Sequence, residues 1–153
     1  MNWKLIIVGG LAYYIAAFAV SMISGPFIHE GILQEAYIAT AEFWRPELRQ
    51  VPPDMAALMP MWITTGLITS FILAGVYGVF RKALGGPAWQ RGLKFGIAAW
   101  LLQASSMAGW SGVFNLPANI WAWWAIDALV FVVVGSIVLG IVAEKLAPVE
   151  QQA

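Results

Sequence analysis

The chain contains no cysteine, which excludes disulfides, thiol redox chemistry, iron–sulfur clusters and thiolate zinc sites. Charge is also scarce, because 10% of the 153 residues are charged, against roughly 25% in an ordinary soluble domain. The 8 basic and 8 acidic residues give a net charge of zero, so no global positive field attracts nucleic acid. With one histidine the sequence offers no bis-histidine haem ligation and no histidine cluster for a metal. We therefore expect no metal, cofactor or nucleic-acid partner.

The sequence is instead strongly apolar, because 61% of its residues are hydrophobic and the mean hydropathy is +0.77. Segments of about 18 or more apolar residues are typical of membrane-spanning helices. Four such segments occur, at about residues 3–24, 56–80, 93–114 and 118–146. The sequence thus predicts an all-α, polytopic four-helix bundle in a lipid bilayer, one transmembrane domain over 1–146, with a disordered tail at 147–153.

Basic residues set the expected orientation, because Lys and Arg favour cytoplasmic loops. The loop between the second and third segments contains Arg81, Lys82 and Arg91, and Lys4 and Lys145 lie near the two chain ends. We therefore expect both termini in the cytoplasm. The long first connection, at about residues 27–50, is rich in acid and falls on the outer face. Gly25 and Pro26 should break or kink the first helix, and apolar residues at three- and four-residue spacing then predict an amphipathic interfacial helix.

Asp127 is the most informative residue, because it is a lone acid inside the apolar run of the last segment. A carboxylate at such a depth is costly and usually faces a bundle interior or a wet cavity. Counting along each helix places polar groups from all four helices near the same depth. The hypothetical ligand-binding set around Asp127 is Gln103, Ser106, Thr64, Thr65, Tyr14 and Trp100. The same layer also suits a sealed hydrogen-bonded clasp, and the sequence leaves both interpretations open.

Several short motifs occur along the chain: an extracytoplasmic histidine, Tyr37, the run Trp44-Arg45-Pro46, and Gly92-Leu93-Lys94-Phe95-Gly96 at the start of the third segment. Together they resemble small uncharacterised bacterial four-helix membrane proteins. The resemblance implies a multi-pass protein of the bacterial inner membrane. It implies no catalytic residues.

Three functions follow as hypotheses. The first is a non-enzymatic structural or accessory membrane protein, which contacts a membrane protein partner or a second copy through Trp44, Arg45, Glu47 and Arg49. The second is a lipophilic-ligand binder or small transporter that uses the polar layer around Asp127. The third is an interfacial enzyme that uses the neighbouring polar residues His29 and Glu30 in acid–base chemistry. No catalytic motif supports the third, so we expect no enzymatic activity.

Overall fold

The computed structural model describes residues 2–50 and 52–149, and all regular structure within them is helical. The long helices are α1 (Gly10–Gly25), α3 (Met55–Phe80), α4 (Ala88–Ser111) and α5 (Ala118–Leu146). Wide π-helical turns, Leu5–Gly9 and Pro26–Ile32, flank α1, and the first connection holds α2 (Gln34–Ala39) with the 3₁₀ turns Ala41–Phe43 and Pro46–Arg49. Of the predicted disordered tail, residues 147–149 follow α5 without regular structure and the rest lie outside the described residues.

Among the described residues, three continuous helices are long and apolar enough to cross a membrane: Leu5–Ile32, Met55–Phe80 and Ala118–Leu146. They overlap the first, second and fourth predicted segments, and the all-α prediction is confirmed. The third predicted segment corresponds to α4, which begins five residues earlier than expected. It is more polar than the others, because it carries Arg91, Lys94 and Gln103.

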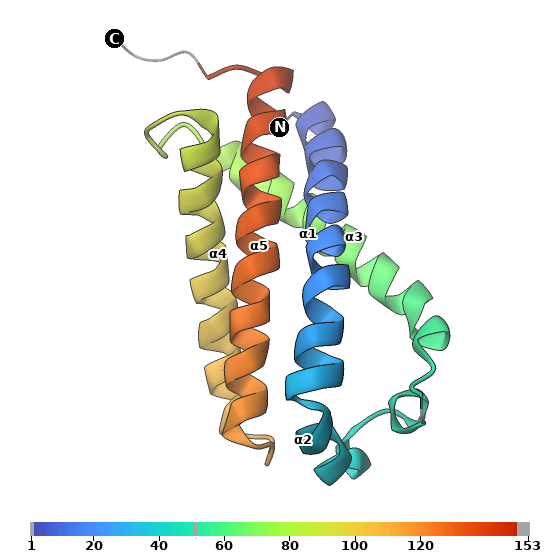
Figure 1. The fold of residues 1–153 in the computed structure, drawn as a ribbon. Helices are drawn as coiled ribbons and strands as arrows, with labels where there is room; N and C mark the ends of the chain where they lie inside the picture. The colour runs from blue at the N-terminus through green and yellow to red at the C-terminus, as the bar shows by residue number, and fades with distance from the viewer. Residues whose placement is uncertain (1, 51, 150–153) are drawn as a thin grey trace.

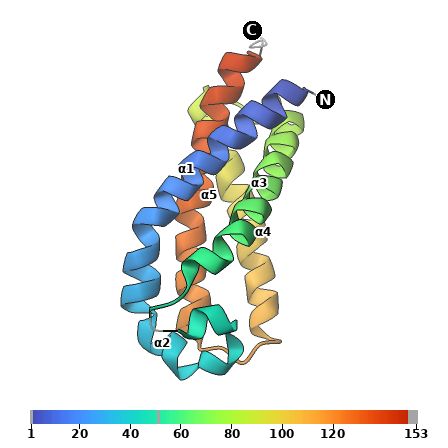
Figure 2. The same cartoon turned by 90° about the vertical axis from the view of Figure 1, so that its right-hand side faces the viewer.

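The start of the first helix and the end of α5 lie at one end of the molecule, which we call the terminal end, and α2 lies at the other, the α2 end (Figure 1). Figures 1 and 2 show α4 and α5 side by side along their length, with α3 crossing α1 obliquely. The main helix contacts join α4 to α5, α1 to α5 and α1 to α3. Because α3 packs mainly on α1, it stands apart from α4 over much of its length.

Glycines let α4 and α5 approach backbone to backbone. A Cβ added at Gly92 would lie 2.8 Å from the Cα of Ile137, and one at Gly96 would lie 3.0 Å from the Cα of Val133. On the facing helix, a Cβ at Gly140 would lie 3.0 Å from the Cα of Gly92. Small residues four apart permit such close packing where lipid removes the hydrophobic drive for association.

Two buried arginines tie the terminal end together. Arg81 donates a hydrogen bond of 3.1 Å to the carbonyl oxygen of Ala143, in the last turn of α5, where exposed carbonyls favour a cation. Arg91 pairs with the carboxylate of Glu144 and also donates to the carbonyl of Gly86. The loop between α3 and α4 is thereby fixed to α5.

The predicted end of the first helix near residue 24 is wrong. The helix continues to Ile32 through a π-helical turn, with the amide of Leu33 donating to the carbonyl of Ile28 at 2.8 Å. Proline lacks an N–H and its ring crowds the preceding turn. The π-helical turn begins at Pro26, and the helix stays continuous past the proline.

The extension changes the first connection. Residues 27–32 belong to the first helix, and the remainder forms α2 and two 3₁₀ turns in place of one amphipathic helix over 27–50. This compact segment packs on the α2 end through Leu33, which is fully buried with Ile28 and Ile120.

Candidate functional site

Asp127 lies on α5 and is buried, with 7% of its surface exposed. The hydroxyl of Ser24, on α1, donates to Oδ1 at 2.6 Å. The Nε2 atom of His29 lies 3.4 Å from Oδ2, which is long for a hydrogen bond. Both oxygens thus have a polar neighbour on the first helix, and each could accept more, since an ionised carboxylate offers about four acceptor positions.

The π-helical turn explains why Ser24 and His29 reach the same acid. In an α-helix, residues five apart are separated by about 140° around the axis. In a π-helical turn, where residue i bonds to residue i+5, they lie closer to one face. The proline-widened turn therefore positions both side chains against α5.

Further hydrogen bonds connect His29 to Tyr37 and Trp124. The indole Nε1 of Trp124, which can only donate, donates to the hydroxyl oxygen of Tyr37 at 2.7 Å. Nδ1 of His29 lies 2.7 Å from the same oxygen, and either group can donate in that bond. Burial raises the pKa of Tyr37, which keeps this hydroxyl protonated.

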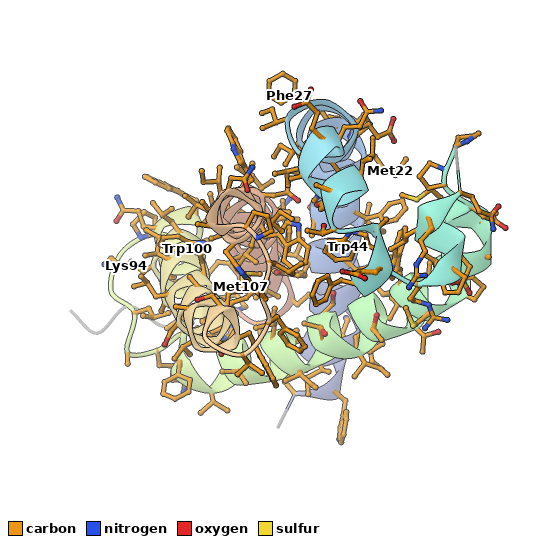
Figure 3. The ribbon with its side chains drawn as sticks, turned by 90° about the horizontal axis from the view of Figure 1, so that it is seen from below. Met22, Phe27, Trp44, Lys94, Trp100 and Met107 are labelled. Atoms are coloured by element: carbon orange, nitrogen blue, oxygen red, sulfur yellow. The ribbon has the colours of Figure 1, made fainter. Side chains whose placement is uncertain are left out.

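An open cavity of about 180 Å³ adjoins the acid, and we call it the Asp127 cavity. Its walls come from the first helix, α4 and α5, and its lining residues are His29, Gln103, Met107, Trp124, Asp127, Ala128 and Phe131. Seen from the α2 end, Phe27 points away from the other helices, and Met107 and Trp100 mark the position of α4 (Figure 3).

A larger space of about 560 Å³, the interhelical cavity, lies where α3 stands apart from α4. All four long helices line it, with Tyr14 and Ser21 on α1, Trp62 and Thr65 on α3, and Ala99 on α4 among the lining residues. Gln103 and Phe131 line both cavities. Such a volume, with mostly apolar and aromatic walls and a few polar groups, is typical of small-molecule sites.

The structure brings together only some of the predicted ligand-binding set. Gln103 lines the Asp127 cavity, and Tyr14 and Thr65 line the interhelical cavity with it. Ser106, Thr64 and Trp100 line neither cavity. The hydroxyls of Ser106 and Thr64 donate to carbonyls of their own helices, and the indole of Trp100 donates across to the Ala125 carbonyl at 2.8 Å.

The predicted partner-contact residues also differ from one another in their surroundings. Trp44 packs inward against Tyr37 and Trp124, and its indole donates to the carbonyl of Tyr37 at 3.1 Å. In Figure 3, which views the molecule from the α2 end, Trp44 lies near the centre and not at the edge. Arg49 folds back onto the carbonyls of Trp44 and Glu42. Arg45 forms an ion pair with Glu47 and remains exposed.

His29 and Glu30 do not act as a pair. Glu30 is exposed and lines neither cavity, whereas His29 turns toward Asp127. His29 and Asp127, which the sequence analysis treats as separate candidates, therefore belong to one site.

Ser24, Tyr37 and Trp124 are residues of the candidate site that the sequence does not single out as partners of Asp127. Ser24 falls at the end of the first predicted segment, and Trp124 is one of nine tryptophans. The signal available for Ser24 was its five-residue spacing from His29 across Gly25-Pro26, which suits a π-helical turn.

Comparison of this chain with family models, curated proteins and solved structures finds no match. The function must be argued from the site alone.

Proposed function

We propose that this protein is a membrane protein that binds a lipophilic ligand between its helices. The observation that carries the proposal is the pair of neighbouring cavities, which share Gln103 and Phe131 and end at a buried acid. An apolar body would occupy the interhelical cavity, and a polar head group would reach Asp127.

The proposal includes four membrane crossings in a bacterial inner membrane, with both termini in the cytoplasm. Close packing of α4 along α5 supports a fourth crossing, although α4 is more polar than its neighbours. The start of the first helix, the end of α5 and the basic loop after α3 share the terminal end, which agrees with the tendency of Lys and Arg to remain cytoplasmic (Figure 1). The α2 end then faces outward. The bacterial setting rests on the resemblance given by the sequence motifs.

The separation of α3 from α4 supports entry of the ligand from the bilayer. Lipophilic molecules concentrate in the membrane, so a space bordered by two helices that do not pack closely is reached without passing through water. The accessory role and the absence of enzymatic activity stay predictions.

Photolabelling in liposomes tests the proposal. The probe is a neutral long-chain alcohol with a diazirine in its chain, and peptide mass spectrometry locates the attached label. We expect label on cavity residues such as Tyr14, Thr65 and Gln103, in addition to the general labelling of surfaces that face lipid.

A matched pair of variants separates the cavity from the lipid-facing surface. Ala99 lines the interhelical cavity, whereas its neighbour Ala98 is exposed and does not. Ala99→Phe should remove most of the label from the cavity residues, and Ala98→Phe should leave it unchanged. Equal labelling of the cavity residues in both variants would contradict the proposal.

A further inference from the structure

We infer that the ligand is a lipophilic amine whose protonated head group binds the carboxylate of Asp127, displacing His29. The inference rests on the proposed function and adds the chemical class of the ligand.

Charge at the Asp127 cavity selects a cation. Its lining contains one acid, one histidine and one amide, and no lysine or arginine. The arginines of the terminal end are held by α5 and the loop before α4, and Arg49 is held by carbonyls of the first connection. Because a low-dielectric surrounding strengthens interactions between charges, an anionic head group would be repelled by Asp127 and a cation attracted.

The acid has room for a further donor. Ser24 occupies one acceptor position at 2.6 Å, while the contact with His29 at 3.4 Å is long and the histidine side chain is 36% exposed. An ammonium group has three donors and would replace this contact with a shorter, charge-assisted bond. The side-chain oxygen of Gln103, in the same lining, provides a second acceptor.

Aromatic side chains complete the environment of the head group. Trp124 and Phe131 line the Asp127 cavity, and ring faces attract cations, with tryptophan the most favourable. Phe131 also lines the interhelical cavity, so an alkyl or aryl body attached to the amine passes directly into the larger space.

A neutral alcohol of the same chain length would bind more weakly. It offers one hydrogen to the carboxylate and gains neither the charge attraction nor the contact with the ring faces. The single neutral donor of the alcohol makes a weaker bond to the carboxylate than the charged ammonium donors of the amine make.

Competition for the photolabelled site tests the inference. Dodecylamine and dodecanol are compared as competitors of the diazirine alcohol, with each concentration expressed in the membrane phase. In the unchanged protein the amine should compete at a concentration about tenfold lower than the alcohol. In Asp127→Asn that preference should disappear while the alcohol still competes, which also shows that the variant is folded. Asp54→Asn is the matched control, since Asp54 caps α3 outside both cavities and asparagine is also a good cap.

Each outcome has one meaning. Equal competition by amine and alcohol in the unchanged protein overturns the inference and leaves the proposed function standing. Failure of both competitors overturns the proposed function itself. A preference for the amine that persists in Asp127→Asn overturns the assignment of Asp127 as the binding group.

Discussion

Replacement of Gly92 by alanine tests the close approach of α4 and α5 on which the site's geometry depends. The new Cβ would lie 2.8 Å from the Cα of Ile137, well inside an ordinary van der Waals contact. The obstacle is backbone, so the helices must separate by several tenths of an ångström. Overpacking of this kind costs about 1–3 kcal/mol.

Helix propensity acts in the opposite direction, because alanine is favoured over glycine by about 1 kcal/mol inside a helix. Gly109 on the same helix provides the control, since an added Cβ there meets nothing within 4 Å. Both variants gain the same propensity. The free energy of unfolding of Gly92→Ala should therefore fall about 1–3 kcal/mol below that of Gly109→Ala.

Reversible unfolding by sodium dodecyl sulfate in mixed micelles, followed by tryptophan fluorescence, measures this difference. Separation of α4 from α5 would also shift Gln103 relative to Asp127, so Gly92→Ala should weaken binding of the photolabelled alcohol. Agreement of the two variants within about 0.5 kcal/mol would refute the close backbone contact.

Three further predictions concern polar contacts, and each has its own measurement. Glu144→Gln leaves the buried guanidinium of Arg91 without its charged partner; because the glutamate is 32% exposed, we expect a loss of about 1–3 kcal/mol in the same unfolding assay, and no loss would contradict the pairing. Tyr37→Phe removes the hydroxyl that bonds to both Nδ1 of His29 and Nε1 of Trp124, and in the same assay it should lower the free energy of unfolding by about 1–3 kcal/mol. His29→Ala removes the 3.4 Å contact with Asp127 that the amine is expected to displace, so amine competition should become stronger, and unchanged competition would contradict the displacement of His29.

Apolar length and loop chemistry were sufficient to predict the helices. Gly85-Gly86-Pro87 and Asn115-Leu116-Pro117 fall in the gaps between the predicted segments, and the structure has its connections there, between α3 and α4 and between α4 and α5. The small-residue pairs Gly92 with Gly96 and Ser136 with Gly140 do form a close contact, as their four-residue spacing indicates. Hydrophobic periodicity and turn-forming Gly, Pro and Asn residues predict these features because both signals are local in the sequence.

The site could be predicted only in part, because its key determinant is an irregular turn. Asp127 stands out through its charge, and a depth count along straight helices brings Gln103 near it. The same count assumes that the first helix ends near Ser24, and it therefore places His29 outside the membrane layer. The π-helical turn at Pro26 removes that boundary, and no local propensity distinguishes a widened turn from a helix end.

Crystallisation with 12-bromododecylamine tests the central claim most directly, because bromine is located by its anomalous scattering. We expect the amine nitrogen beside the carboxylate of Asp127 and a bromine peak in the interhelical cavity, near Tyr14 and Thr65. Bromine found only on the outer surfaces of the helices, with His29 still against Asp127, would contradict the account.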